Sequence, residues 1–482
     1  MTDAWLSYSF SLTWLYWLLT IAYLITVVSI VGVVLSENRN PVKSLAWVAV
    51  LLMFPVGGLV LYIFFGRSIK NKRMISRRNR RRLRETSRPK VPESDLRYLA
   101  PDMRQLVELG RSTVGAAYLG GNDIEVYNDG AEKFEALLRD IRQAQRYIHL
   151  QYYIFEDDEL GRRIADALIE RASRGVTVRV IYDHIGSYGV TGKFFKYLRA
   201  NGVEAYPFFR VAFPPFATRI NWRNHRKMVI IDGKIGYIGG MNVAQRYIDG
   251  GTFDKWRDCH LRITGPGVAA LHYSFGVDWS FMGRPLFSET VNADVSTDPG
   301  AAGVQLLTSG PTSQWSAVAL QMLKAIGLAR KRVYIQTPYF LPTEGLLRTL
   351  QAAALAKVDV RVMMPYRSDS RILTYASYSY IMECVRAGIK IYLYKGGMLH
   401  SKTMIIDDGL SAIGSANIDF RSFEHNFEST MFIYSRSVNG RLAQLFEVDE
   451  RECERVVEAA WRNRSKVQKA KESMTRLLSP IL

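Results

Sequence analysis

Cysteine is scarce in this chain of 482 residues. The three cysteines, Cys259, Cys384 and Cys453, are odd in number and lie far apart in the sequence. This pattern argues against a disulfide framework and against a zinc site. Aspartate, glutamate and histidine are not grouped at the spacing of metal ligands either, so we predict neither a metal ion nor any other cofactor.

Acidic residues are also in short supply. The chain has 45 aspartates and glutamates against 64 lysines and arginines, which gives a formal net charge of +19. A balance this basic predicts an anionic partner, either nucleic acid or an anionic membrane surface. Hydrophobic residues make up 48% of the chain and charged residues 23%, so the chain as a whole is folded rather than disordered or membrane-embedded throughout.

Two stretches near the N-terminus contain no charge at all, residues 12–35 and residues 44–66. About 20 apolar residues are enough to cross a bilayer as a helix. The second stretch contains Pro55, Gly57 and Gly58, which membrane helices tolerate. A cleaved signal peptide fits poorly, because no basic segment precedes the first stretch and a second stretch follows at once. We therefore expect residues 1–66 to form a transmembrane helical hairpin.

A strongly basic run follows the second stretch. Residues 67–90 contain twelve lysines and arginines and one acid, Glu85. The positive-inside rule places this run, and both termini, on the cytoplasmic side of the membrane. We expect residues 67–115 to be a juxtamembrane linker in which each basic residue gains on the order of 1 kcal/mol near an anionic leaflet.

The remaining sequence is written twice. A strand pattern at 146–155, a helix pattern at 161–175 and a strand pattern at 176–183 recur in the same order at 332–340, 344–357 and 358–365, and Gln151 recurs as Gln336. Strands that alternate with helices predict an α/β sheet with helices on both faces. We predict two similar α/β halves, residues 116–295 and 296–482.

Each half carries one copy of an eight-residue pattern. Residues 225–232 read HRKMVIID and residues 400–407 read HSKTMIID. Along a strand the histidine and the lysine two residues later share a face. The dipeptides Asp232-Gly233 and Asp408-Gly409 predict hairpin turns. The returning strands end in Gly240-x-Asn242 and Ser415-x-Asn417, so that chance is excluded as the origin of the repeat.

The repeated residue types suit attack on a phosphodiester. If the halves face each other across a pseudo-twofold axis, His225 and His400 converge on one phosphorus atom. One neutral imidazole can attack phosphorus, and the other, protonated, can give its proton to the leaving alkoxide. Four more side chains would hold the nonbridging oxygens: Lys227, Lys402, Asn242 and Asn417. The other histidines are expected to be structural: His149, His184, His260, His272 and His425.

The paired HxKxxxxD motifs, each followed by GG or GS and then x-N, resemble the phospholipase D superfamily from about residue 120 to the end. The resemblance implies a catalytic set and a substrate-binding set. The first is His225, Lys227, Asp232, His400, Lys402 and Asp407, in which the aspartates are mainly structural; the second is Asn242, Asn417, Gly240 and Ser415. It also implies an acid that orients each histidine, for which Asp258 and Glu428 are the candidates, and His225 as the nucleophile.

A narrower resemblance covers nearly the whole chain. The uncharged stretches, the basic run, NWRNHRKMVIIDGKIGYIGGMN, MLHSKTMIIDD, GSANIDFRSFEHNFE and the closing RLLSP are similar to bacterial cardiolipin synthases. This implies a multi-pass protein of the bacterial cell membrane that transfers a phosphatidyl group between two phosphatidylglycerol molecules and releases glycerol. Phosphatidylglycerol and anionic membrane lipids are then its partners, with no nucleic acid expected and with a homo-oligomer possible.

Several points stay open on the sequence alone. The motifs do not select an alcohol over water, so a membrane-bound phospholipase D or nuclease is an alternative, as is a lipid-binding scaffold with a dead site. The apolar segment 207–216 either dips into the membrane interface or belongs to the core. Four residues either line the site or only pack: Asp369, Tyr375, Tyr378 and Tyr380.

Overall fold

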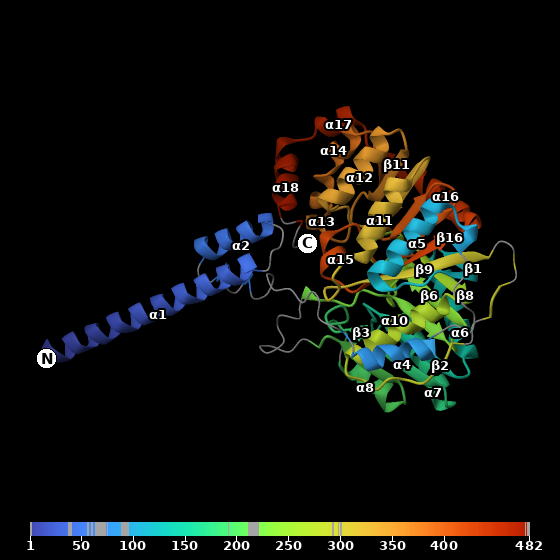
Figure 1. Cartoon of the computed structure of the whole chain (residues 1–482), viewed down its shortest axis with the longest axis horizontal. Helices are drawn as coiled ribbons and strands as arrows, with labels where there is room; N and C mark the ends of the chain where they lie inside the picture. The colour runs from blue at the N-terminus through green and yellow to red at the C-terminus, as the bar shows by residue number, and fades with distance from the viewer. Residues whose placement is uncertain are drawn as a thin grey trace. The chain divides into compact units, whose positions relative to one another are not determined.

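The computed structural model describes residues 2–36, 41–54, 57–58, 61–62, 74, 76–87, 96–190, 192–210, 221–291, 294–296, 298, 301–477 and 479. The chain divides into two compact units (Figure 1). The N-terminal unit comprises Met1–Ile69 with Ala212–Asn221, and the sheet unit comprises Lys70–Val211 with Trp222–Leu482.

The N-terminal unit contains helices α1 (Thr2–Ser36) and α2 (Pro41–Met53). The hydroxyl of Tyr23 on α1 donates to the carbonyl of Leu51 on α2 at 3.3 Å. A search of the described residues for a helix with both the length and the apolar character of a membrane span finds none. The hairpin of spanning helices that the sequence suggests therefore stays a prediction.

The sheet unit is built on one mixed sheet of 15 strands in the described part of the chain. The first half contributes β1 (Leu119–Tyr127), β2 (Tyr147–Tyr152), β3 (Thr177–Asp183), β4 (Glu204–Phe208), β5 (Met228–Ile231), β6 (Ile235–Gly239) and β8 (His260–Thr264). The second half contributes β9 (Ala302–Ser309), β10 (Arg332–Gln336), β11 (Asp359–Pro365), β12 (Lys390–Tyr394), β14 (Thr403–Ile406), β15 (Leu410–Gly414), β16 (Glu428–Tyr434) and the edge strand β17 (Cys453–Arg455).

The two halves have the same strand order. Outward from the centre, the first half runs β1-β8-β6-β5-β2-β3-β4 and the second runs β9-β16-β15-β14-β10-β11-β12. The two innermost strands, β1 and β9, pair antiparallel, with Leu119 opposite Val304. An antiparallel pair at the centre of two like-ordered halves gives the pseudo-twofold relation, and the expected α/β architecture of two halves is confirmed.

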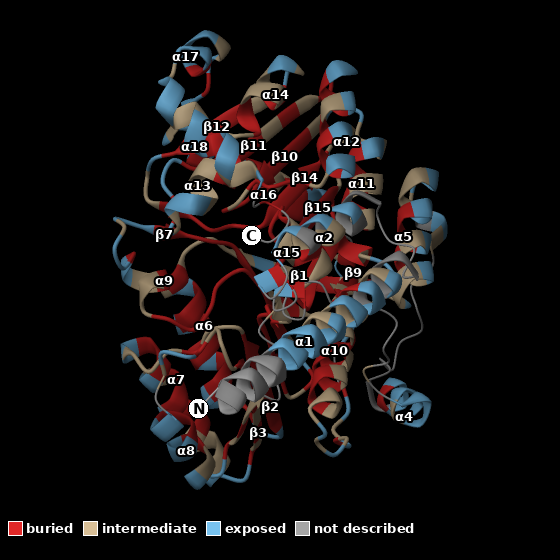
Figure 2. Ribbon diagram, turned by 90° about the vertical axis from the view of Figure 1, so that its left-hand side faces the viewer, coloured by how far each residue is buried: buried red, intermediate tan, exposed pale blue. Residues whose placement is uncertain are grey.

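Helices cover both faces of this sheet. One face carries α6 (Gly130–Gln143), α7 (Glu159–Ser173) and α8 (Gly192–Ala200) at one end, and α11 (Ala317–Leu328) and α12 (Glu344–Leu355) toward the other (Figure 1). The opposite face carries α10 (Val268–Phe281) and α16 (Arg436–Glu450). Successive strand residues alternate between the faces: Met228 and Ile230 pack on the α10 side, and Val229 and Ile231 pack on the α6–α8 side. Buried residues accordingly follow the strands (Figure 2).

The last residue of each octapeptide closes a hairpin at the end of the strand remote from the histidine. Asp232 has φ 54° and Gly233 has φ 67°, so the first turn forms at the predicted dipeptide. In the second hairpin the turn spans residues 407–409 and so includes the predicted Asp408-Gly409, and Asp407 takes the positive φ, 46°. The equivalent of Gly233 is Asp408, because the two octapeptides align without a gap.

Both motif aspartates bind the backbone at the start of a neighbouring strand. The carboxylate of Asp232 accepts from the N–H groups of Gln145, Arg146 and Tyr147 at 2.7–2.9 Å. The carboxylate of Asp407 accepts from the equivalent N–H groups before and at the start of β10, at 2.7–3.1 Å. The aspartates therefore fix the register of the hairpins that carry the histidines, and their role is structural.

This contact gives a prediction for stability. Asp407→Gly keeps the positive φ accessible but removes the carboxylate, so we expect it to lower the free energy of unfolding by about 1–3 kcal/mol, since three backbone donors lose a charged acceptor. Asp408→Gly is the matched control, because that exposed carboxylate forms surface ion pairs with Lys331 and Arg332 worth less than about 1 kcal/mol. Equal losses in the two variants, measured by denaturant or thermal unfolding, would contradict the capping role.

Candidate functional site: a cavity between the two halves

The two motif histidines line one cavity in the sheet unit, of about 580 Å³. His225 lies three residues before the first residue of β5, and His400 lies three residues before the first residue of β14. The cavity wall draws on both halves: Tyr153, Ile154, His225, Asn242, Arg246, Tyr247, Gly251, Thr252 and Trp256 from the first, and Tyr339, Asp369, Leu373, His400, Asn417, Asp419, Arg421 and Asn426 from the second. The convergence on which a shared reaction centre depends is therefore present.

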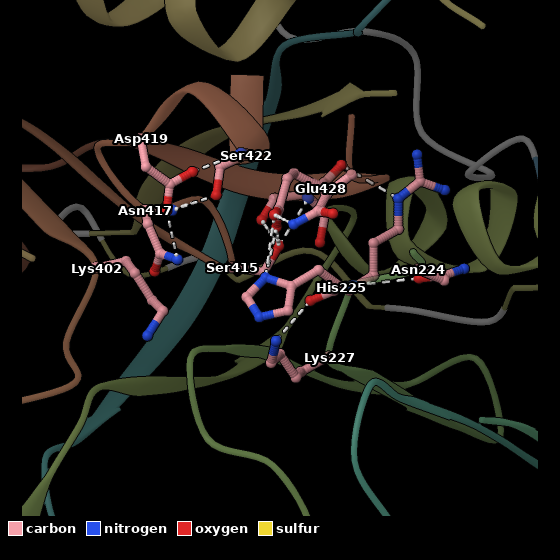
Figure 3. Close-up of polar contacts among 12 residues, drawn as sticks. Asn224, His225, Lys227, Lys402, Ser415, Asn417, Asp419, Ser422 and Glu428 are labelled. Atoms are coloured by element: carbon pink, nitrogen blue, oxygen red, sulfur yellow. Dashed lines mark hydrogen bonds and ion pairs between the residues drawn. The ribbon is translucent and has the colours of Figure 1, made fainter. Parts of the chain in front are cut away.

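Each histidine is oriented by a carboxylate from the other half. Nδ1 of His225 lies 3.0 and 3.1 Å from the two carboxylate oxygens of Glu428 on β16 (Figure 3). Nδ1 of His400 lies 2.7 Å from a carboxylate oxygen of Asp258, which stands between β7 (Trp256–Arg257) and β8. Both candidate acids thus contact a histidine, and the pairing crosses the centre of the sheet.

The backbone repeats the same exchange. The N–H of His225 donates to the carbonyl of Phe427 at 2.9 Å, and the N–H of His400 donates to the carbonyl of Arg257 at 2.7 Å. Strand β13 (Met398–Leu399), directly before His400, pairs in parallel with β7. Each histidine is thereby fixed at both its backbone and its ring by residues of the opposite half.

Burial and the facing carboxylate set the charge of the His225 ring. Removal from water lowers the pKa of His225 to about 4, although Glu428 partly offsets the effect. Burial alone would raise the pKa of Glu428, but His225, Lys227 and the hydroxyl of Ser415 outweigh it and the pKa is lowered. The pair is therefore a neutral imidazole that donates from Nδ1 to an ionised carboxylate, which leaves the Nε2 lone pair available.

His400 has a more crowded ring nitrogen. Besides Asp258, Nζ of Lys402 lies 2.7 Å from its Nδ1 and the hydroxyl of Tyr247 lies at 3.5 Å. An Nδ1–H that donates to Asp258 offers no lone pair, so Lys402 can act there only as a nearby positive charge. Burial and Lys402 lower the pKa of His400 to about 4, and burial lowers the pKa of Lys402 to about 8.

The two motif lysines occupy equivalent places. Nζ of Lys227 donates to the carbonyl of His225 at 2.7 Å, and Nζ of Lys402 donates to the carbonyl of His400. Both side chains are buried, and burial lowers the pKa of Lys227 well below its usual value. Neither lysine is among the residues that line the cavity, whereas both histidines are. Each lysine therefore contacts its own histidine on the side away from the cavity.

The four residues expected to bind substrate fall into two groups. Asn242 and Asn417 line the cavity; the amide of Asn242 donates to the hydroxyl of Tyr247 at 2.8 Å and that of Asn417 to Asp419 at 3.0 Å. Gly240 and Ser415 lie instead against the orienting acids. A Cβ at Gly240 would stand 2.1 Å from Asp258, and the hydroxyl of Ser415 donates to Glu428. These two positions act on the acids rather than on the cavity.

Two buried arginines brace the orienting acids, and sequence inspection did not single them out. Arg226 donates to the carbonyl of Glu428 at 3.1 Å and pairs with Asp278 on α10 at 2.6 Å. Arg257 donates to the carbonyl of Asp258 at 2.8 Å and pairs with Asp449 on α16 at 2.8 Å.

The repeated glutamines Gln151 and Gln336 are the sequence feature from which the contacts behind the two acids could have been inferred. Gln151 on β2 donates to Asp278 at 2.6 Å and Gln336 on β10 donates to Asp449 at 2.7 Å. Asp278 also accepts from the amide of Asn224, directly before His225, at 3.0 Å. One aspartate in each half therefore ties β2 or β10 to the residues around the site.

Of the residues whose role the sequence did not decide, Asp369 lines the cavity and the three tyrosines do not. Asp369 lines the cavity and accepts from the hydroxyl of Tyr339 at 2.7 Å. Tyr378 and Tyr380 are buried against other parts of the second half, and Tyr375 is half-buried; none of the three lines the cavity. In the segment 207–216, Phe208 is a core residue, while residues 211–216 lie outside the described residues.

The lowered pKa values of the two histidines predict acid sensitivity. Each ring stays neutral in the folded chain down to about pH 4 but is protonated near pH 6.5 when unfolded, so its stabilising contribution is complete above pH 6.5 and is lost as the pH falls toward 4. Between pH 7 and pH 5 we expect the free energy of unfolding of the native chain to fall further than that of the double variant His225→Gln/His400→Gln. The difference should be on the order of 1–2 kcal/mol for each histidine. Unfolding curves that shift in parallel for both proteins would rule this out.

Known proteins resemble this chain along most of its length. The family described as "Cardiolipin synthase, PLD-like domain" matches residues 137–272 and 322–449, and the family described as "Phospholipase_D-nuclease N-terminal" matches residues 21–67. The cardiolipin synthase of Oceanobacillus iheyensis is 37% identical, with 96% of this chain and 99% of that protein covered. The major cardiolipin synthase of Bacillus subtilis is 37% identical with the same coverage, and a cardiolipin synthase of Staphylococcus aureus is 36% identical, with 96% of each chain covered.

Solved structures share the fold at low sequence identity. A phosphatidylserine synthase of Haemophilus influenzae matches with a TM-score of 0.59 at 14% identity, over 78% of this chain and 100% of that one. A polyphosphate kinase of Porphyromonas gingivalis matches with a TM-score of 0.50 at 13% identity, over 75% of this chain and 54% of that one. With two motif-bearing halves around one cavity and relatives at 36–37% identity over nearly its whole length, the chain belongs to the cardiolipin synthase family of the phospholipase D superfamily.

Proposed function

We propose that this chain makes cardiolipin by transferring a phosphatidyl group from one phosphatidylglycerol molecule to another, with release of glycerol. The observation that carries the proposal is the pair of buried, carboxylate-oriented imidazoles that line one cavity from opposite halves. Its family supports the choice of substrate, since the relatives are named cardiolipin synthases.

In the first step Nε2 of His225 attacks the phosphorus of the donor lipid. The new P–N bond forms as the P–O bond to the donor's terminal glycerol breaks, which leaves a phosphatidyl group on His225. The tautomer supports this role. Nδ1 of His225 donates its hydrogen bond to Glu428, so the lone pair lies on Nε2, on the side of the ring away from Glu428. His225 is the better nucleophile of the two, since no cation contacts its Nδ1 among the described residues, whereas Lys402 lies 2.7 Å from that of His400.

His400 supplies the proton for the leaving glycerol and later takes one from the acceptor. A bound phosphodiester adds a negative charge beside both rings, which favours a protonated imidazole, and Asp258 is placed to stabilise it. In the second step the hydroxyl of a second phosphatidylglycerol gives its proton to His400 and attacks phosphorus, and the P–N bond to His225 breaks. Cardiolipin leaves, and both rings return to their starting states.

Positive and polar groups around the cavity suit an anionic diester. Arg246 and Arg421 line the wall, and Lys227 and Lys402 contribute positive charge from behind the histidines. In a buried site such donors stabilise charge that develops on the nonbridging oxygens. Asp369 and Asp419 also line the cavity and are acceptors for the free hydroxyls of a glycerol headgroup.

The N-terminal unit is the proposed membrane attachment. Several large apolar side chains of α1 are exposed, among them Trp14, Trp17 and Leu18. Together with the uncharged stretches 12–35 and 44–66 they support an anchor in the cell membrane, with the sheet unit on the cytoplasmic side beside the basic run. Such an anchor keeps both lipid substrates close to the cavity.

The products formed from phosphatidylglycerol vesicles test the proposed reaction. The purified chain should convert phosphatidylglycerol into cardiolipin and release one glycerol per cardiolipin. Thin-layer chromatography measures the lipid products, and an enzymatic assay measures the glycerol. Phosphatidic acid as the main product would make the chain a hydrolase, because water would then be the acceptor. Tight vesicle binding without any product would instead indicate a scaffold.

The division of labour between the histidines predicts different losses. His225→Ala should abolish the covalent phosphatidyl adduct, because it removes the attacking atom. His400→Ala should still form the adduct slowly from a substrate whose leaving group needs no proton, and should then fail to transfer it. Quenched reactions with a lipid labelled in the acyl chain report the adduct on the protein. An adduct in the first variant and none in the second would reverse the assignment.

A further inference from the structure

A second cavity of about 660 Å³ lies in the sheet unit and shares no lining residue with the first. Its volume is within the range of sites that bind small molecules. Its wall includes α4 (Arg77–Ser87), the end of α5 (Pro101–Val114), α10, β9, the segments that follow α5 and β9, and the residues Arg226 and Phe427.

The charge of this second cavity has one sign. Three arginines line it, and no aspartate or glutamate occurs among its lining residues. Arg226 is neutralised by its buried pair with Asp278. Arg80 and Arg84 are exposed one helical turn apart on α4, and neither takes part in an ion pair within the described part of the chain. Two positive charges therefore stand at the cavity without a counter-charge from the described residues.

The position of these arginines is fixed by packing. Leu83 on α4 is 1% exposed and belongs to the core cluster formed by α10. It fits against Gly276, where a Cβ would stand 2.4 Å from Leu83 Cδ1. The amide of Asn79 also donates to the hydroxyl of Ser280 at 3.4 Å. Helix α4 is thus docked on α10, and its arginines are held beside the cavity.

Part of the wall of the second cavity is apolar, and two buried hydroxyls lie in the same wall. Ala269, Ala270, Val277, Leu306 and Phe427 provide hydrocarbon surface. The side-chain oxygens of Ser274 and Ser309 are buried, with residue exposures of 4% and 1%, and have no hydrogen-bond partner among the described residues. An unpaired buried hydroxyl costs free energy, so both oxygens are suited to a ligand that brings its own polar atoms inside.

We propose that this cavity binds an anionic diacyl phospholipid at a site separate from the catalytic one. The lipid phosphate lies between the guanidinium groups of Arg80 and Arg84, the ester oxygens accept from Ser274 and Ser309, and one acyl chain occupies the apolar part of the cavity. Phe427 and Arg226 form part of the wall and are directly adjacent in sequence to Glu428 and His225. An occupant therefore contacts the residues that brace the catalytic pair.

A photoreactive lipid tests this site without relying on turnover. The probe is phosphatidic acid with a diazirine in one acyl chain, whose phosphate carries no alcohol to be displaced. It is incorporated in detergent with the full-length chain, and the labelled peptides are mapped by mass spectrometry. Label is expected at 269–277 and 306–314. A diacylglycerol probe with the same chain lacks the phosphate and should label these peptides about tenfold less, as expected for loss of a charged hydrogen bond.

Three variants make the result decisive. Arg80→Gln/Arg84→Gln should reduce the label about tenfold, whereas Arg78→Gln/Arg82→Gln removes the same charge from another face of the same helix and should leave the label unchanged. Ala270→Phe fills the apolar part of the cavity and should reduce the label with the arginines intact. Label confined to catalytic-cavity peptides such as 246–256, equal labelling by diacylglycerol, or equal loss in the two arginine variants would overturn the proposal.

Discussion

Two carboxylates that cross from one half of the sheet to the other set the geometry of this site. Glu428 orients His225 and Asp258 orients His400, so each half supplies the base-orienting group that the other half lacks. A buried imidazole without a hydrogen-bond partner would be costly, and its tautomer would be undefined. Neither half can therefore provide a buried and oriented histidine alone, and in the proposed reaction the association of the halves is a condition of catalysis as well as of the fold.

The surrounding framework keeps this exchange in register. The central β1–β9 pair brings together two halves of equal strand order, and the β7–β13 pair carries the backbone of one half to the histidine of the other. The buried pairs Arg226–Asp278 and Arg257–Asp449 then tie the two orienting acids to helices on the face of α10 and α16. Breaking such a pair leaves an uncompensated buried charge, so its members hold the acids firmly.

Much of this arrangement was predictable from the repeat, and the rest needed three dimensions. Two copies of HxKxxxxD in matched strand and helix patterns indicated two α/β halves, and strand periodicity placed His225 beside Lys227. The crossed pairing was not predictable, because sequence spacing does not say which half an acid faces. Gly240 and Ser415 were expected at the substrate. Gly240 lies instead against the carboxylate of Asp258, and Ser415 lies against the carboxylate of Glu428.

A double-mutant cycle on unfolding free energy tests the crossed pairing most directly. His225→Ala and Glu428→Ala are compared singly and together, with His225→Ala and Asp258→Ala as the same-half control. The structure predicts an interaction free energy of about 1 kcal/mol or more for His225 with Glu428 and a value near zero for His225 with Asp258. A measurable interaction of His225 with Asp258, and none with Glu428, would contradict the account.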